Sequence, residues 1–193
     1  MAVITGNMLV DKFRQYEYVR YTWGGASPDT GWDCSGACNY IIGWLFKLDI
    51  PGFGPGAWGP GAGHGPVVGD WIQWVGVTRG VFGPVVPAPG DLIAWGPNVH
   101  MGMAIDGTRF VSAANPNDGT IEANIGSFFT WAPFVLRLLQ TRTGATTPPG
   151  LPIPRLPAAS SMTNWSGTIS ATAARANGAA SNLSRFALAT RRE

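Results

Sequence analysis

The sequence is poor in charge. Asp, Glu, Lys and Arg make up 12% of its 193 residues, about half of the ~25% found in ordinary domains, and the formal net charge is only +2. Residues 1–142 hold 8 Lys and Arg against 10 Asp and Glu, so the positive excess lies in residues 143–193. A nucleic acid is not favoured as a partner, because its phosphates need a concentrated basic surface.

Long apolar runs are also missing. The longest, YIIGWLF, is interrupted by glycine and is far shorter than the ~20 residues of a membrane span, so we predict a core helix and no span. The N-terminal sequence MAVITGNMLVDKFR has no basic start followed by an apolar stretch, and we therefore expect no secretory signal. Cysteine is scarce: Cys34 and Cys38 are four residues apart on one expected helix, where a disulfide would be strained, so we expect free thiols.

Glycine and proline are abundant, with 27 and 16 residues, which predicts a small α+β core with long ordered loops. Apolar spacing predicts helices over residues 5–19, capped by Asn7, and 33–48. Strands are expected in VHMGMAI and TRFVSA, joined by a tight Asp-Gly turn, and in FVLRLLQ. PGFGPGAWGPGAGHGP has no apolar period and predicts an irregular lid or rim. The tryptophans in and after this lid have two interpretations, core packing or stacking on a glycan: Trp58, Trp71 and Trp74.

The composition changes near residue 143. Residues 1–142 are expected to form the folded domain. Residues 143–160 contain TTPPGLPIPRLP, which is typical of an extended proline-rich linker. Residues 161–193 predict a weak helix whose apolar residues recur at spacings of three and four, and such a seam can pack against another helix.

The motif GWDCSG predicts a nucleophile at a helix start. Asp33 at the cap position can accept the free N–H groups of the first turn. Cys34 then lies at the positive end of the helix dipole, which favours a thiolate, and we expect its pKa to be lowered. The alternative is a buried structural cysteine. Small Ser35 lets a substrate approach, whereas Cys38, one turn further on, is expected in the core.

A cysteine nucleophile needs a base, and the chain has two histidines. His64 lies in a glycine-rich loop that we expect to hold an imidazole poorly. His100 lies on a predicted strand, sharing one face with small Gly102 and Ala104, which would leave room for a cleft. We therefore assign His100 as the base and expect His64→Ala to leave turnover nearly intact. A zinc site from Cys34, Cys38, His64 and His100 is an alternative, but its spacing fits no usual zinc pattern, and we predict no metal or other cofactor.

Three segments, YTWGG…GWDCSG, PGDLIAW and VHMGMAI, resemble in order the signatures of the NlpC-type cell-wall cysteine peptidases, over about residues 5–140. The resemblance implies a papain-like α+β core, with N-terminal helices packed on a small antiparallel sheet, that cuts peptide bonds in bacterial peptidoglycan stems. It implies Cys34 as nucleophile and His100 as base. The residues implied to position substrate lie around the thiol: Tyr21, Asp33 and Ser35. The third polar residue of the family falls at Ser112, and Asn115 is the other candidate to orient His100.

These features predict a peptidoglycan endopeptidase acting through a thioester. The alternative is a structural phage tail-tip protein that keeps the fold with weak or no activity. Because no export signal is expected, we predict a bacteriophage protein located in the virion tail, or in the host cytoplasm until lysis releases it to the wall. Residues 161–193 would then dock on other virion tail proteins.

Overall fold

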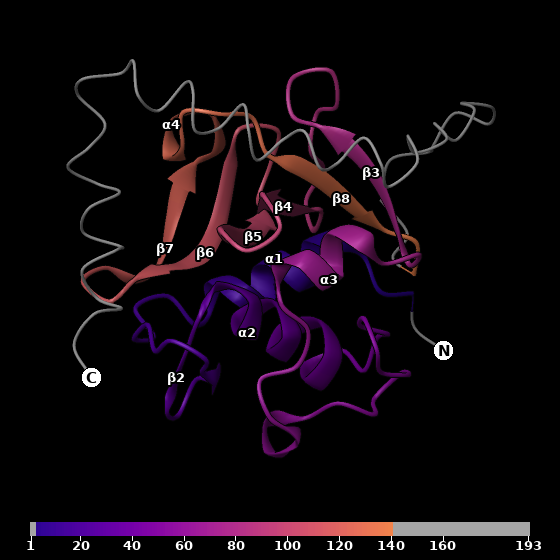
Figure 1. Ribbon diagram of the computed structural model, residues 1–193, viewed down its shortest axis with the longest axis vertical. Helices are drawn as coiled ribbons and strands as arrows, with labels where there is room; N and C mark the ends of the chain where they lie inside the picture. The colour runs from indigo at the N-terminus through magenta and orange to yellow at the C-terminus, as the bar shows by residue number, and fades with distance from the viewer. Residues whose placement is uncertain (1–2, 141–193) are drawn as a thin grey trace. The chain divides into compact units, whose positions relative to one another are not determined.

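A computed structural model describes residues 3–140, which form an α+β arrangement (Figure 1). The helices are α1 (Gly6–Arg14), α2 (Cys34–Asn39), the π-helix η1 (Tyr40–Leu45), the 3₁₀-helix η2 (Pro60–Ala62), α3 (Val68–Gln73) and α4 (Ile125–Phe128). The strands are β1 (Ala26–Ser27), β2 (Gly31–Trp32), β3 (Val77–Val81), β4 (Leu92–Trp95), β5 (His100–Ala104), β6 (Arg109–Asn115), β7 (Gly119–Asn124) and β8 (Phe134–Leu138). The predicted linker, 143–160, and docking helix, 161–193, lie outside the described residues. Within residues 3–140, each helix is too short or too polar to cross a bilayer.

Six strands form one antiparallel sheet in the order β3-β8-β4-β5-β6-β7. The predicted hairpin of β5 and β6 is confirmed. Asp106 Oδ1 accepts the backbone N–H groups of Thr108 and Arg109, both at 2.9 Å, and so fixes the turn. The strand predicted in FVLRLLQ is β8. Strands β3 and β7 were not predicted, because they form the two edges of the sheet and lack a continuous apolar pattern.

The first helix is shorter than predicted. Thr5, not Asn7, caps it: its hydroxyl accepts the backbone N–H of Met8 at 3.4 Å. The helix ends at Arg14, five residues before the predicted end. Leu9 and Phe13 are fully buried by this helix, so the predicted apolar stripe still forms part of the core.

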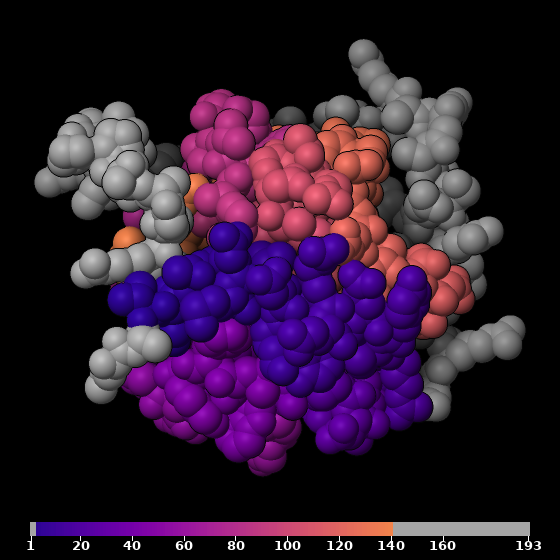
Figure 2. Space-filling model, turned by 180° about the vertical axis from the view of Figure 1, so that it is seen from behind, coloured from indigo at the N-terminus to yellow at the C-terminus, as the bar shows by residue number. Residues whose placement is uncertain are grey.

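The second helix begins where the sequence predicts, at Cys34 behind the Asp33 cap. After Asn39 it continues as the wider π-helix η1. Its inner face is completely buried, at residues Ala37, Cys38, Ile41 and Ile42. In Figure 1, α1, α2 and α3 lie together on one side of the sheet. From behind, the N-terminal segment lies between the sheet and the 51–66 loop (Figure 2).

The sheet carries an apolar cluster on each face. Met101 and Met103 belong to the larger cluster, together with Cys34 and the helices, as the strand alternation predicts. Trp95 and Phe110 belong to the smaller one, which α4 covers. The predicted cleft beside His100 is wrong, since aromatic rings fill the space next to the small residues on its face.

Candidate active site

Asp33 organises the start of α2 with both of its carboxylate oxygens. Oδ1 accepts the backbone N–H of Gly36 at 2.8 Å and the Ser35 hydroxyl at 3.1 Å. Oδ2 accepts the backbone N–H of Gly24, in the preceding turn, at 3.0 Å. The predicted cap is therefore confirmed. It also ties the glycine-rich turn to the first residues of the helix, so the position of Cys34 is set by two segments.

The Cys34 thiol is buried, with 7% of the residue exposed. Burial and the negative charge of Asp33 raise its pKa to about 12, although the backbone N–H groups of Met101, Ser35 and Cys34 itself hydrogen-bond the thiolate and lower it. The predicted low pKa is thus wrong. The helix start does supply N–H donors, but desolvation of a charge in an apolar interior outweighs them. At neutral pH the resting group is a thiol.

His100 lies at the first position of β5, and its Nε2 is 3.0 Å from the Ser112 hydroxyl. Of the two candidates to orient the ring, Ser112 makes the contact. Asn115 does not: its side chain bonds Asp118 and the backbone of Asn117 in the next turn. The alternation of β6 explains this, because Ser112 shares a sheet face with His100, whereas Asn115 lies beyond the irregularity in the β6–β7 register.

Aromatic rings surround the His100 imidazole. Phe128 of α4 stacks on it, with centroids 4.9 Å apart and an interplanar angle of 29°. Trp95, Phe129 and Phe110 lie at 5.9, 6.0 and 6.3 Å. Burial lowers the pKa of His100 to about 3, and the negative charge of Asp33 only partly opposes this. The imidazole is therefore neutral at neutral pH, as a general base must be.

The thiol and the imidazole both belong to the region at the start of β5, but on opposite faces of the sheet: Cys34 packs in the larger apolar cluster with Met101 and Met103, and His100 lies among the aromatic rings of the smaller one. The backbone N–H that reaches the sulfur belongs to Met101, the residue after His100. Within residues 3–140 the thiol and the ring share no hydrogen bond, and apo sites are often looser than their substrate complexes. Burial raises the pKa of the Tyr21 hydroxyl, and the charges of Cys34 and Asp33 raise it further, so Tyr21 lies within electrostatic reach of both groups. These residues offer a neutral thiol, a neutral imidazole and N–H donors.

The loop that was predicted to be a lid reaches this site. It has no regular structure except η2, but the expectation that it holds His64 poorly is wrong. His64 Nε2 lies 2.8 Å and 3.0 Å from the two Asp33 oxygens. Sequence patterns missed this pair, since 31 residues separate the partners and nothing local marks it.

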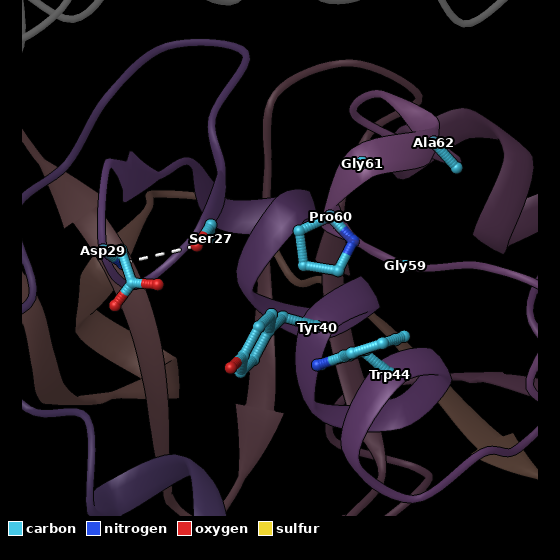
Figure 3. A pocket seen from close by; sticks show the side chains of 8 residues that line it. All are labelled: Ser27, Asp29, Tyr40, Trp44, Gly59, Pro60, Gly61 and Ala62. Carbon is cyan, nitrogen blue, oxygen red and sulfur yellow. Dashed lines mark hydrogen bonds between the residues drawn. The ribbon is translucent and has the colours of Figure 1, made fainter.

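The buried tryptophans of this region support the core interpretation. Trp58 and Trp71 are 1% and 0% exposed. A hollow of about 480 Å³ lies beside η1 and η2 (Figure 3). It is lined by Ser27, Asp29, Tyr40, Trp44 and residues 59–62. Trp44 is 39% exposed, with Lys47 Nζ 3.5 Å from its ring centroid and Gly59 packed closely against the ring.

The zinc alternative finds no support in the described residues. Within 3–140, no three His, Cys, Asp or Glu side chains are grouped as a metal site would require. Both cysteines are free thiols, and His64 and His100 have separate partners, Asp33 and Ser112.

Solved structures provide the comparison for the fold. The chain is similar to the NlpC/p60 domain of the peptidoglycan hydrolase SagA, with 24% identity, a TM-score of 0.52, and coverage of 70% of this chain and 100% of that one. It is also similar to a lipoprotein-like protein of the NLP/P60 family from Staphylococcus aureus, with 22% identity, a TM-score of 0.47, and coverage of 69% and 41%. No family model and no curated protein matches. Residues 3–140 therefore have an α+β fold of the NlpC/p60 type, with N-terminal helices packed on a six-stranded antiparallel sheet.

Proposed function

We propose that the protein is a peptidoglycan endopeptidase that cleaves a stem-peptide bond with Cys34. The observation that carries the proposal is the cysteine at a capped helix start, whose sulfur is reached by the backbone N–H of Met101 on β5. His100, the first residue of that strand, and the Ser112 hydroxyl that contacts it supply the candidate base. The fold similarity to a domain of a peptidoglycan hydrolase supports the substrate class.

In the proposed reaction the Cys34 sulfur attacks the carbonyl carbon and its proton passes to His100. The carbonyl oxygen becomes an oxyanion, which the backbone N–H at the helix start can stabilise. When the C–N bond breaks, His100 returns the proton to the leaving amine and a thioester remains. Water, deprotonated by His100, then attacks the thioester; the carboxylic acid leaves and Cys34 regains its proton.

Because the resting groups are a neutral thiol and a neutral imidazole, proton transfer must accompany attack. The enzyme would thus differ from a cysteine hydrolase whose thiolate and imidazolium form before substrate arrives. Ser112 holds Nε2 of the base, so the proton can be exchanged at Nδ1. We propose Tyr21, Asp33 and Ser35, around the thiol, as the residues that position substrate.

A structural role with weak or no activity is the second candidate. It is favoured by the burial of Cys34 and by the raised pKa of its thiol. In this case the protein keeps the fold as a structural part of an assembly. For both candidates we propose that the protein is located in the virion tail. One experiment separates the two candidates.

That experiment is mass spectrometry of purified peptidoglycan after digestion by the wild type, Cys34→Ala and Cys38→Ala. Wild type and Cys38→Ala should release the same stem-peptide fragments, and Cys34→Ala none. Cys38 is a matched control, one turn along the same helix and 0% exposed. If the folded wild type releases no fragment, the structural candidate is correct. If Cys34→Ala cleaves normally, Cys34 is not the nucleophile.

A further inference from the structure

His64 and Asp33 form an ion pair next to the thiol. Nε2 donates to Oδ1 at 2.8 Å, and the side chains are only 20% and 9% exposed. The other ring nitrogen, Nδ1, is 3.2 Å from the Gly65 carbonyl oxygen. Carboxylate and carbonyl oxygens only accept, so both nitrogens must carry a proton to satisfy these contacts. The surroundings of His64 therefore favour the charged imidazolium.

The loop around His64 is fixed from both sides. Asn39 Nδ2, on α2, donates to the carbonyl oxygens of His64 at 3.0 Å and of Pro66 at 2.9 Å. The side-chain oxygen of Asn39, Oδ1, accepts the Trp71 indole N–H at 3.0 Å. A side chain at Gly65 would clash with Trp58, so the loop also lies tightly on a buried ring. The imidazolium is thus held against the helix that carries the nucleophile.

A positive charge at this place has a clear effect. Asp33 is 6% exposed, and its negative charge raises the pKa of the Cys34 thiol. A thiolate beside an unpaired buried carboxylate would be strongly opposed, since like charges in a poorly solvated site repel. Through its 2.8 Å contact with Asp33, the charged His64 opposes that repulsion.

We propose that His64 is a positioning residue that supplies, through its ion pair with Asp33, a positive charge that offsets the carboxylate as the Cys34 sulfur loses its proton. The glycine-rich loop is then part of the active site, rather than only a rim around it. The proposal deepens the proposed function, on which it rests for the role of Cys34. It replaces the expectation that His64→Ala leaves turnover nearly intact.

The effect depends on pH with a definite sign. Its hydrogen bond to Asp33 raises the pKa of His64, and in turn His64 helps lower the pKa of Asp33. Among the described residues, Asp33 is the charged group that acts on His64. The pair is fully charged between pH 3.8 and pH 6.5 and loses its positive member as the pH rises through the raised pKa of His64. At the acidic end, the negative member is lost as the pH falls below 3.8 and through the depressed pKa of Asp33.

The test is the rate of iodoacetamide alkylation, measured from pH 5 to pH 10, with Cys34 and Cys38 followed separately by mass spectrometry. Only the thiolate reacts. His64→Gln keeps a donor for Asp33 and removes the charge. At pH 6 this substitution should slow the alkylation of Cys34 about tenfold, because a rise of about one unit in the thiol pKa lowers the thiolate fraction about tenfold. The ratio of wild-type to variant rates should approach one above the raised pKa of His64, where the wild type has also lost the charge.

Lys47→Gln is the matched control. It removes one positive charge from a side chain that contacts the Trp44 ring beside the same loop and that, among the described residues, forms no ion pair with Asp33, and it should leave Cys34 alkylation unchanged. Circular dichroism melting checks that each variant is folded. A ratio for His64→Gln that is constant with pH, or equal to that of Lys47→Gln, overturns the proposal. Alkylation needs no substrate, so this result is separate from the peptidoglycan digest that tests the reaction.

Discussion

Ser112→Ala removes the hydroxyl that contacts the base. Ser112 is 0% exposed and His100 is 4% exposed, so water cannot easily replace the 3.0 Å contact at Nε2. Leaving a buried polar atom without its partner costs about 1–3 kcal/mol. We therefore expect the free energy of unfolding to fall by about 1–3 kcal/mol, which chemical denaturation can measure.

The same substitution should reduce catalysis more than binding. If the lost hydrogen bond oriented the imidazole for proton transfer, the transition state loses that energy and kcat falls about tenfold to hundredfold, at 1.4 kcal/mol per factor of ten. KM should change little, because Ser112 holds the base and we assign it no contact with substrate. The imidazole ¹⁵N chemical shifts should also change. The chain has two histidines, so spectra of His64→Gln identify the signals of His100.

Thr120→Val is the matched control for a buried hydroxyl. Thr120 lies on β7, next to the strand that carries Ser112, and is 0% exposed. Its hydroxyl accepts the Trp32 indole N–H at 2.8 Å. It should lose comparable stability while kcat and the His100 shifts stay at wild-type values. If Ser112→Ala leaves both kcat and the ¹⁵N shifts unchanged, Ser112 does not orient the base.

Two further predictions concern the aromatic cover and the C-terminal segment. Phe128→Ala should let water reach the imidazole and raise the pKa of His100 from about 3 towards 6.5, moving the acidic limb of the activity profile to higher pH. Phe82 belongs to the same apolar cluster but makes no ring contact with His100 within the described residues, so Phe82→Ala should leave the pKa of His100 unchanged. An NMR pH titration of His100 in the two variants checks both expectations. We also propose that residues 161–193 dock the protein on other virion tail proteins. Deleting residues 144–193 should then preserve hydrolysis of soluble muropeptides and abolish incorporation into particles, and normal incorporation of the truncated protein would contradict this.

Features set by short sequence separations could be predicted. The Asp33 cap needs Gly36, three residues away, and the Asp106 turn needs Thr108 and Arg109. The strand alternation placed Met101 and Met103 on the face opposite to His100, and the structure confirms this. Each of these follows from the local period and from turn chemistry, which the sequence displays directly.

Features set by long-range packing could not. The thiol pKa was predicted from the helix dipole, but burial decided it, and burial depends on every segment that covers the residue. The rings that fill the space beside His100 come from β4, β6 and the segment around α4. The contact between His64 and Asp33 joins a loop without a period to a helix 31 residues earlier. Local sequence patterns do not indicate which residues so far apart in the chain lie close together in space.

The two shifted pKa values have a consequence for any pH profile of this site. The pKa of His100 is about 3 and that of Cys34 about 12, so neither member of the reacting pair changes charge between about pH 4 and pH 10. The charges left beside the thiol are those of Asp33 and His64. Of these two, His64 is the member whose pKa is raised from 6.5, by its hydrogen bond to Asp33. An inflection of Cys34 reactivity in this range would therefore report the loop histidine, and assigning it to His100 would misidentify the base.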